Sequence, residues 1–235
     1  MMNRVAVITG SSRGIGLAVA EKFAMQGFDV VIHGRNQEKL NAIAEDLHIR
    51  FQVNVTGIAA DLSDKADCVS FVAKVFALHP SIDVLVNNAG VFLPGTLMEE
   101  TDNQMEMQMS TNFFSAYFTT KGLWTVLKKN ERSHVINMCS IASITAYDAG
   151  GGYAVTKHAL HGFTKSLRKE GIPLGIRVTS VMPGATYTDS WSSVDLPQSR
   201  FMTTSDVANT VWNAWEINEH TVMEEVIIRP IEGDI

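Results

Sequence analysis

The chain has 235 residues, is 46% hydrophobic and 19% charged, and carries a formal net charge of −6. Its basic residues are scattered, which argues against a nucleic-acid or anionic membrane surface, and no apolar run reaches the roughly 18–20 residues of a membrane span. Its two cysteines, Cys68 and Cys139, are too few for a disulfide framework. Because a strand-like run begins almost at the first residue, we expect no signal peptide, a cytoplasmic protein and no metal site.

Apolar runs and helical spacing alternate through the first part of the chain. Short runs rich in β-branched residues predict strands, and apolar residues three and four positions apart predict amphipathic helices between them. The expected strands are Val5–Thr9, Phe28–His33, Val53–Ala60 and Ile82–Val86, and the expected helices are Ile15–Gln26, Gln37–Leu47 and Ser63 to about Leu78, the last capped by Ser63. This alternation predicts an α/β protein, with a parallel sheet that has helices on both faces.

The same pattern continues to the end of the chain. A helical stretch from Asp102 to about Lys129 should break near Met109–Ser110, and its second part is apolar on nearly every side, so it should face both the sheet and a second subunit. The other expected elements are strands at Val135–Met138, Ile176–Val181 and Glu225–Arg229, helices at Gly152–Glu170 and from Thr204 or Ser205 to Asn218, and a loop at 185–202. Because nothing interrupts the alternation, we expect one domain over residues 1–235.

The glycine-rich stretch from Thr9 to Gly16 lies between the first expected strand and the first expected helix. Glycines at such a turn let backbone N–H groups approach a pyrophosphate, and the positive end of the helix dipole favours the anion. A plain tight turn is the alternative. Because the stretch opens a strand–helix–strand unit, the sequence predicts a dinucleotide site.

The end of the second strand bears on the choice of dinucleotide. An NAD site places an acid there for the ribose 2′-hydroxyl, whereas this sequence has Arg35 after His33-Gly34. Arg35, together with Arg13 from the glycine-rich stretch, can pair with a 2′-phosphate, so we expect NADP(H) rather than NAD. Asp61 could accept a hydrogen bond from the adenine amino group, or could simply stand at a helix start, and Asn87–Gly90 could line the adenine ribose or form a turn.

Tyr153 and Lys157 occur in the spacing Y-x-x-x-K. If Gly150–Gly152 opens a helix, the two side chains lie one turn apart on one face. An ammonium beside a phenol lowers the tyrosine pKa from about 10 towards neutrality, which would make Tyr153 a general acid or base. Ser140, thirteen positions upstream, should lie at the carboxyl end of a strand, where open α/β sheets bind ligands. The alternative is a half-buried ring and a solvated ammonium on an amphipathic helix.

TGSSRGIG, the Asp61 strand end, NNAG, Asn112, Ser140, YAVTK and the Pro-Gly turn together resemble the short-chain dehydrogenase/reductase family over nearly the whole chain. The resemblance implies a single Rossmann-type, doubly wound parallel sheet of about seven strands, and a dimer or tetramer built on helices at about 110–129 and 152–170. Met182, where the family often has asparagine, and Cys139 depart from the pattern, but neither removes a catalytic group.

The resemblance also implies roles for single residues. Tyr153 would protonate the substrate carbonyl as hydride arrives, Lys157 would lower its pKa and bind the nicotinamide ribose, Ser140 would bind the carbonyl, and Asn112 would anchor a water that relays protons to Lys157. Thr188 would hold the carboxamide. The full set of expected cofactor-binding residues is Gly10, Ser12, Arg13, Gly14, Ile15, Gly16, Arg35, Asn36, Asp61, Leu62, Asn88, Ala89, Gly90, Tyr153, Lys157, Pro183, Gly184, Thr186 and Thr188.

The substrate should lie under the loop Ala185–Met202. Tyr187 and Trp191, with Tyr147 from the other side and Ser140 below, would suit a compact planar or apolar carbonyl compound, although Trp191 could instead pack the loop down as core. The C-terminal stretch resembles bacterial sepiapterin reductases, which would bring Trp191 against a pterin ring and Asp234 to its amino edge, unless Asp234 belongs to a frayed terminus.

Two other functions fit parts of the sequence. A 3-oxoacyl-[acyl-carrier-protein] reductase would need a basic docking patch for its acidic partner, and the sequence has candidate cations for one: Lys121, Lys128, Lys129, Arg132, Lys165, Arg168 and Lys169. A non-enzymatic NADP-binding sensor on the same fold is disfavoured, because the tyrosine, lysine, serine and asparagine of the expected site are all present.

Overall fold

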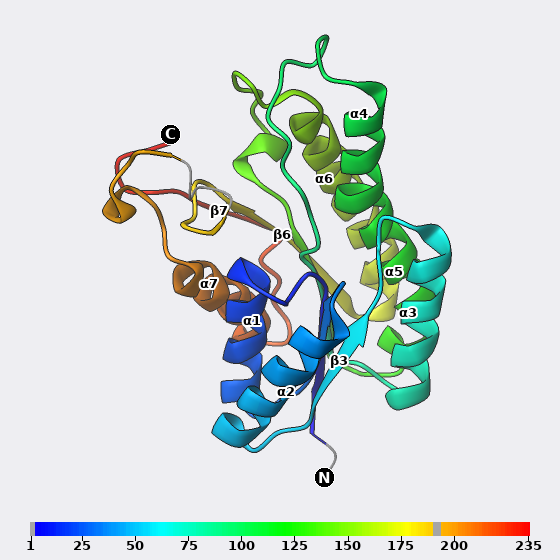
Figure 1. The fold of residues 1–235 in the computed structure, drawn as a ribbon. Coiled ribbons are helices and arrows are strands. Elements are labelled where there is room, and N and C mark those ends of the chain that lie inside the picture. Colours follow the sequence, from blue (N-terminus) through cyan, green and yellow to red (C-terminus); the bar gives the residue numbers. More distant parts are fainter. Residues whose placement is uncertain (1–2, 190–193) are drawn as a thin grey trace.

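The computed structural model describes residues 3–189 and 194–235 (Figure 1). The described residues form a seven-stranded parallel sheet in the order β3-β2-β1-β4-β5-β6-β7. The strands are β1 (Val5–Ile8), β2 (Asp29–Gly34), β3 (Val55–Ala59), β4 (Val84–Asn87), β5 (Ser133–Met138), β6 (Ile176–Pro183) and β7 (Glu225–Ile228).

Helices cover both faces of this sheet. They are α1 (Gly14–Met25), α2 (Gln37–Phe51), α3 (Lys65–Leu78), α4 (Asp102–Met109), α5 (Ser115–Leu127), α6 (Gly151–Gly171) and α7 (Thr204–Glu216). One face carries α1, α2 and α7, and the other carries α3, α5 and α6 (Figure 1). The predicted Rossmann-type, doubly wound α/β fold is therefore confirmed.

Each face of the sheet has its own apolar core, because side chains alternate along a strand. In β1, Ala6 and Ile8 belong to the core under α1 and α7, whereas Val5 and Val7 belong to the core under α3 and α5. Aromatic rings fill the first core: Phe23 packs edge-on against Phe28 and Trp212, at 5.1 and 5.4 Å between ring centroids. These two cores hold the strands rigid beneath the loops that follow them.

Two local features differ from or refine the prediction. Asp64, not Ser63, caps α3, because its carboxylate accepts hydrogen bonds from the backbone N–H groups of Ala66 and Asp67. The side chain of Ser63 donates instead to Asp61. The expected break near Met109–Ser110 is a π-helical turn, Ser110–Phe114, that joins α4 to α5 without ending the helix.

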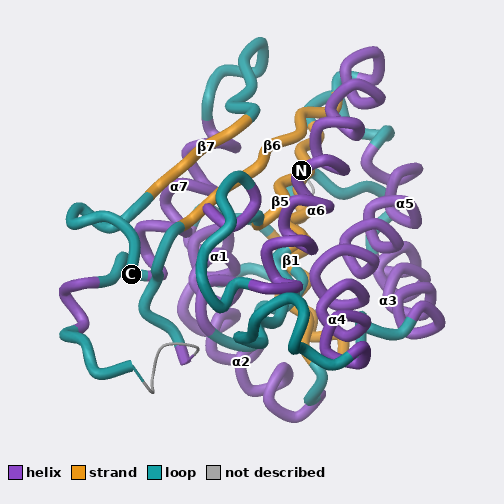
Figure 2. Tube along the Cα trace, turned by 90° about the horizontal axis from the view of Figure 1, so that it is seen from above, coloured by secondary structure: helices purple, strands orange, loops and turns teal. Residues whose placement is uncertain are grey.

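The strand order reverses between β1 and β4, since the chain moves from β1 outward to β3 and then returns to pair β4 on the other side of β1. The loops after these strands therefore diverge and leave a crevice at the carboxyl edge. Seen from above, α4 lies on the side of α3 and α5, while the C-terminal segment lies on the side of β7 and α7 (Figure 2). Within the described part of the chain, no helix has the length and apolar character needed to cross a membrane.

Candidate active site

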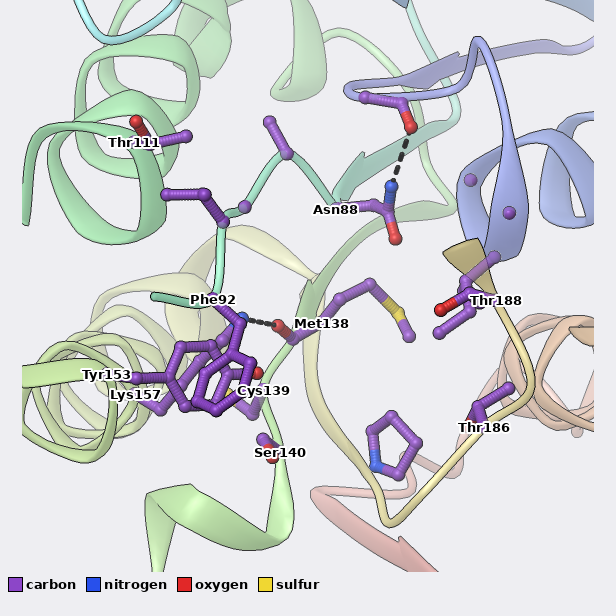
Figure 3. Close-up of a pocket in the computed structure, with 18 of the residues that line it drawn as sticks. Asn88, Phe92, Thr111, Met138, Cys139, Ser140, Tyr153, Lys157, Thr186 and Thr188 are labelled. Carbon is purple, nitrogen blue, oxygen red and sulfur yellow. Dashed lines mark hydrogen bonds between the residues drawn. The ribbon is translucent and has the colours of Figure 1, made fainter. Parts of the chain in front are cut away.

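A cleft of about 590 Å³ lies in this crevice. Every strand from β1 to β6 ends in it, so residues far apart in the sequence share one cavity. Figure 3 shows Asn88, Thr186 and Thr188 on one side of Met138, and Phe92, Ser140, Tyr153 and Lys157 on the other. We call the side with Asn88, Thr186 and Thr188 the cofactor half, and the side with Phe92, Ser140, Tyr153 and Lys157 the substrate half.

The glycine-rich loop after β1 lines the cofactor half. Gly10 has φ +63°, in the left-handed region that favours glycine, and a Cβ at Gly16 would overlap the carbonyl oxygen of Gly10. Arg13, the residue before α1, makes no side-chain hydrogen bond to the helix start, so the first N–H groups of α1 stay available to a ligand. The loop thus has the cradle and the donors that a dinucleotide pyrophosphate needs.

His33, at the end of β2, supports this loop from below. The N–H of Gly10 donates to Nδ1 of His33 at 2.9 Å, and Nε2 lies 3.1 Å from the carbonyl of Ala60, so the ring is neutral with its proton on Nε2. Burial lowers the pKa of His33 to about 4, despite opposing contributions from the Ala60 carbonyl and Asp61. One feature of the sequence marks this residue: it is a polar side chain near the end of an otherwise apolar strand.

Asn88 joins the loop after β4 to the loop after β1. Its Nδ2 donates to the carbonyls of Thr9 and Gly10, each at 3.0 Å (Figure 3), and Thr9 Oγ1 accepts from the backbone N–H groups of Asn88 and Ala89. The two loops on either side of the switch point therefore move as one unit.

The outer end of the cofactor half carries charged residues. Arg35 is exposed and lines the cleft, and Arg13 forms an ion pair with Asp189 at 2.9 Å. Asp61 accepts from the backbone and hydroxyl of Ser63 at 3.0 and 2.7 Å, and this bonding holds the pKa of Asp61 below its usual value. The arrangement can bind an adenosine that carries a phosphate.

Ser140, Tyr153 and Lys157 meet in the substrate half. Ser140 follows β5, and its Oγ accepts from the N–H of Ala142 at 3.1 Å, while Tyr153 is the third residue of α6. Lys157, one turn later, donates to the Met138 carbonyl at 2.8 Å, and its Nζ lies 5.6 Å from the centre of the Tyr153 ring (Figure 3). The helical spacing predicted for the tyrosine and the lysine is observed.

The pKa of Tyr153 differs from the sequence-based expectation. Burial raises it to about 12; a side-chain hydrogen bond with Ser140 acts in the opposite direction, and the neighbouring Cys139 adds to the rise. The expected lowering by Lys157 is not observed, because the ammonium binds the Met138 carbonyl rather than the phenol oxygen. Burial also lowers the pKa of Lys157 itself. Tyr153 is therefore protonated at neutral pH.

Asn112 lies in the π-helical turn, behind the cleft rather than in its lining. Its Oδ1 accepts from the N–H of Val91 at 2.7 Å, and its Nδ2 donates to the Val91 carbonyl and to Thr156 Oγ1 at 2.9 and 3.0 Å. A methyl group built on Gly90 would lie 3.3 Å from Asn112 Oδ1 and 3.7 Å from Lys157 Nζ, so both atoms border the same small space.

Most of the expected site residues line the cleft: Gly10, Arg13, Gly14, Ile15, Gly16, Arg35, Asp61, Leu62, Asn88, Ala89, Gly90, Ser140, Tyr147, Tyr153, Lys157, Pro183, Gly184, Thr186 and Thr188. Besides Asn112, three expected residues do not. Ser12 packs against Gly34, Asn36 caps α2 by accepting from the N–H of Lys39, and Tyr187 packs edge-on against Phe201. Trp191 lies outside the described residues.

Several lining residues were not expected from the sequence. Phe92 packs edge-on against Tyr153 at 5.0 Å between ring centroids, and Met107, Thr111 and Thr145 add to the same wall. Met107 and Thr111 are four apart, a spacing that also fits an ordinary helix face, so the sequence held no distinct signal for them. Asp234, for which a frayed terminus was the favoured interpretation, also lines the cleft and pairs with Arg229.

Comparison with known proteins agrees with the geometry. A family model described as short chain dehydrogenase matches residues 4–198. The chain is 32% identical to a sepiapterin reductase from Chlorobaculum tepidum, over 100% of this chain and 99% of that protein. It is 30% identical to a 3-oxoacyl-[acyl-carrier-protein] reductase from Aquifex aeolicus, over 90% and 89% of the two chains. An alcohol dehydrogenase from Thermococcus sibiricus, solved with 5-hydroxy-NADP, superposes with a TM-score of 0.92 at 27% identity, covering 99% and 98% of the chains.

The buried neutral His33 makes stability depend on pH. Its pKa is about 4 in the folded protein against about 6.5 in the unfolded chain, so the unfolded chain binds the extra proton between these values. We therefore expect the free energy of unfolding to fall as the pH drops through this window, with His33 contributing up to about 3 kcal/mol. Urea unfolding of the wild-type protein and of His33→Asn, at about pH 7 and about pH 4.5, measures the contribution.

His33→Asn should lose less stability on acidification than the wild-type protein does. His220→Asn is the matched control, because the side chain of His220 is 86% exposed and should leave the pH dependence unchanged. Equal losses in the wild-type protein and His33→Asn would contradict the prediction.

Proposed function

The chain belongs to the short-chain dehydrogenase family and is an oxidoreductase, and from this premise we propose that it is an NADPH-dependent carbonyl reductase acting on compact, uncharged ketones. The observation that carries the proposal is the meeting of Ser140, Tyr153 and Lys157 in an apolar half-cleft beside a pyrophosphate cradle. A hydride donor bound in the cradle and a proton donor from the protein can then act on the same carbonyl group.

NADPH is the proposed cofactor. The cradle at Gly10 and Gly16, the free helix start and the two arginines of the outer cleft fit a dinucleotide with a 2′-phosphate. The Thermococcus sibiricus structure, which contains 5-hydroxy-NADP, supports the same choice. Thr186 and Thr188, on the loop after β6, are proposed to bind the carboxamide end, with Pro183 and Gly184 shaping the turn.

NADPH, when bound, supplies the hydride. Ser140 and Tyr153 are proposed to donate hydrogen bonds to the carbonyl oxygen, and Tyr153 transfers its proton as negative charge develops there. The raised pKa of Tyr153 suits this direction, because the phenol keeps its proton at neutral pH and an alkoxide is a stronger base than a phenolate. Lys157 is proposed to bind the nicotinamide ribose.

A route for proton resupply is proposed through Asn112. Its Oδ1 and Lys157 Nζ border the same space beside Gly90, which supports a proton relay from Lys157 through a water that Asn112 anchors. The three hydrogen bonds of Asn112 to Val91 and Thr156 keep its amide in one orientation.

The substrate half supports an uncharged ketone. The described lining residues around Ser140 and Tyr153 carry one charged side chain, that of Lys157, which is bound to the Met138 carbonyl. Asp234, which is paired with Arg229, lines the cleft beside Gly184. A substrate carboxylate would therefore find no cation in this half other than Lys157, whose ammonium is already bound to the Met138 carbonyl, and its burial would be costly. The other lining residues of this half are Phe92, Met107, Thr111, Ile141, Thr145, Tyr147 and Ile235.

Sepiapterin-like ketones are the first substrate candidates, on the relationship to the Chlorobaculum tepidum enzyme and on the position of Asp234 at the cleft. A 3-oxoacyl thioester is the second candidate, because of the relationship to the Aquifex aeolicus enzyme.

Self-association of the chain is also proposed. Phe114 and Val155 are 41% and 39% exposed on the outer faces of the π-helical turn and α6, beside the ring cluster of Phe113, Tyr117 and Phe163.

Cofactor choice can be tested at Arg35. Arg35→Asp removes a cation from the proposed 2′-phosphate site and adds a negative charge, so the Kd for NADPH should rise roughly 10- to 100-fold while that for NADH changes by less than about threefold. Fluorescence titration of both nucleotides measures the effect. Lys39→Asp, an equal charge reversal on the exposed side of α2, is the control. Equal losses for the two nucleotides would remove Arg35 from the phosphate site.

The proton donor can be tested with Tyr153→Phe. This change removes only the phenolic oxygen, so we expect kcat to fall by about 10²- to 10⁴-fold with the Kd for NADPH nearly unchanged. Equilibrium titration with NADPH measures the Kd, and steady-state NADPH oxidation measures kcat. Wild-type turnover in this variant would refute the assignment of Tyr153.

Substrate class can be tested by NADPH oxidation with sepiapterin, an acetoacetyl thioester and simple diketones. An oxo acid and its methyl ester form a further pair that differs mainly in charge, and the ester should have a kcat/KM at least about tenfold higher, because the substrate half offers no free cation. Preference for the acid would contradict the uncharged class. Activity with the thioester alone would favour fatty-acid reduction, and no activity with any compound would count against the proposal.

A further inference from the structure

Helix α6 carries Tyr153 in its first turn but supplies no cap of its own. The residue before the helix is Gly150, and no side chain there accepts a hydrogen bond from the helix start. The first two helical residues are Gly151 and Gly152, the residue type that orders least readily in a helix. A first turn of this composition frays unless something outside the helix binds its free N–H groups.

Glu100 supplies that contact from a distant part of the chain. Its Oε2 accepts from the N–H of Gly152 at 3.1 Å, whereas its Oε1 is buried and has no hydrogen-bond partner among the described residues. A carboxylate at a helix N-terminus is also favoured by the helix dipole. Glu100 itself is fixed, because Thr101 directly after it begins α4 with a capping box formed with Gln104.

The glycines of α6 make this approach possible. A Cβ on Gly152 would overlap Oε1 of Glu100, and a Cβ on Gly151 would lie 2.5 Å from the carbonyl of Gly95. The N–H of Gly95 also donates to the carbonyl of Ala149 at 3.1 Å, so the segment from Gly95 to Glu100 runs directly against the start of α6. The glycine run that looked like a helix start in the sequence is also a docking surface for this segment.

We propose that Glu100 is a positioning residue for the reaction: by capping the first turn of α6 it fixes Tyr153 relative to Ser140 and the bound ketone. This inference rests on the proposed role of Tyr153. Lys157 lies one turn deeper and has its own anchor on the Met138 carbonyl, so loss of the cap affects the proton donor and spares the nucleotide site. A displacement of about 1 Å at a reacting group can cost roughly 100-fold in rate.

The test compares Glu100→Ala, Glu100→Asp and Glu100→Gln. Glutamine keeps an oxygen that can accept from Gly152, aspartate keeps the charge but is one methylene shorter, and alanine keeps neither. We expect kcat to fall roughly 10- to 100-fold in Glu100→Ala and less in Glu100→Asp, and to return close to the wild-type value in Glu100→Gln, while the Kd for NADPH stays within about threefold throughout. Glu99→Ala is the control, because Glu99 bonds the neighbouring Thr96 and not α6.

Three outcomes would overturn the inference: unchanged kcat in Glu100→Ala, a parallel loss of kcat and NADPH affinity, or a better rescue by aspartate than by glutamine. If Glu100→Ala does not fold, comparing kcat in Glu100→Asp and Glu100→Gln still tests the inference. The result is separable from that of Tyr153→Phe. An inactive Tyr153→Phe beside a fully active Glu100→Ala would remove only the positioning role, whereas an active Tyr153→Phe would remove the proposed function itself.

Discussion

The close approach of two loops at the switch point between β1 and β4 is the constraint on which the rest of the site depends. A Cβ on Gly10 would lie 2.8 Å from the Cα of Ala89, and the side chain of Asn88 binds the carbonyls of Thr9 and Gly10 across this gap. His33 fixes the same loop from the β2 side through the N–H of Gly10. Because these bonds use the inward-facing groups of the loop, its remaining N–H groups and the start of α1 face the cleft. The packing alone therefore gives the loop a shape that suits a phosphate, since no cation is needed to build it.

Burial governs the chemistry of the substrate half. In water, a lysine near a tyrosine would favour the phenolate, but here Lys157 is buried and Tyr153 is half-buried among protein groups, so each pKa moves towards the neutral form. The Met138 carbonyl holds the lysine, and Phe92 covers the tyrosine ring. The outcome is a protonated phenol at neutral pH, which is the state that a reductase needs before hydride arrives. The spacing of the two residues predicted correctly that they lie one turn apart on a helix, but it gave the wrong sign for the shift of the tyrosine pKa, because spacing carries no information about solvent.

The sequence predicted what depends on local pattern. Strand and helix alternation depends on the periods of two and 3.6 residues, so the seven strands and the doubly wound sheet could be anticipated, and glycine spacing located the tight turn between β1 and α1 that lines the cleft. Contacts between distant segments could not be anticipated: His33 under Gly10, Phe92 against Tyr153 and Glu100 at α6 are separated by 23, 61 and 52 residues. The sequence also could not show which of two adjacent polar residues caps a helix. Ser63 and Asp64 are both good caps, and only the path of the chain after β3 decides between them.

The two halves of the cleft differ in how tightly the fold constrains them. Arg13 and Asp189 are 66% and 73% exposed, and an ion pair in that setting contributes little to stability. Arg35 is exposed in the same way. The substrate half, by contrast, is supported by polar groups whose hydrogen bonds involve backbone atoms: Asn112 to Val91 behind the cleft, Lys157 to Met138 in its lining and Glu100 to Gly152 at the start of α6. Substitutions that alter cofactor preference can therefore occur at little cost in folding free energy, whereas those that alter the proton donor disturb the packing of α6 against the sheet. The proposed roles in cofactor choice and in catalysis thus fall on separate sets of residues, held by the fold to different degrees.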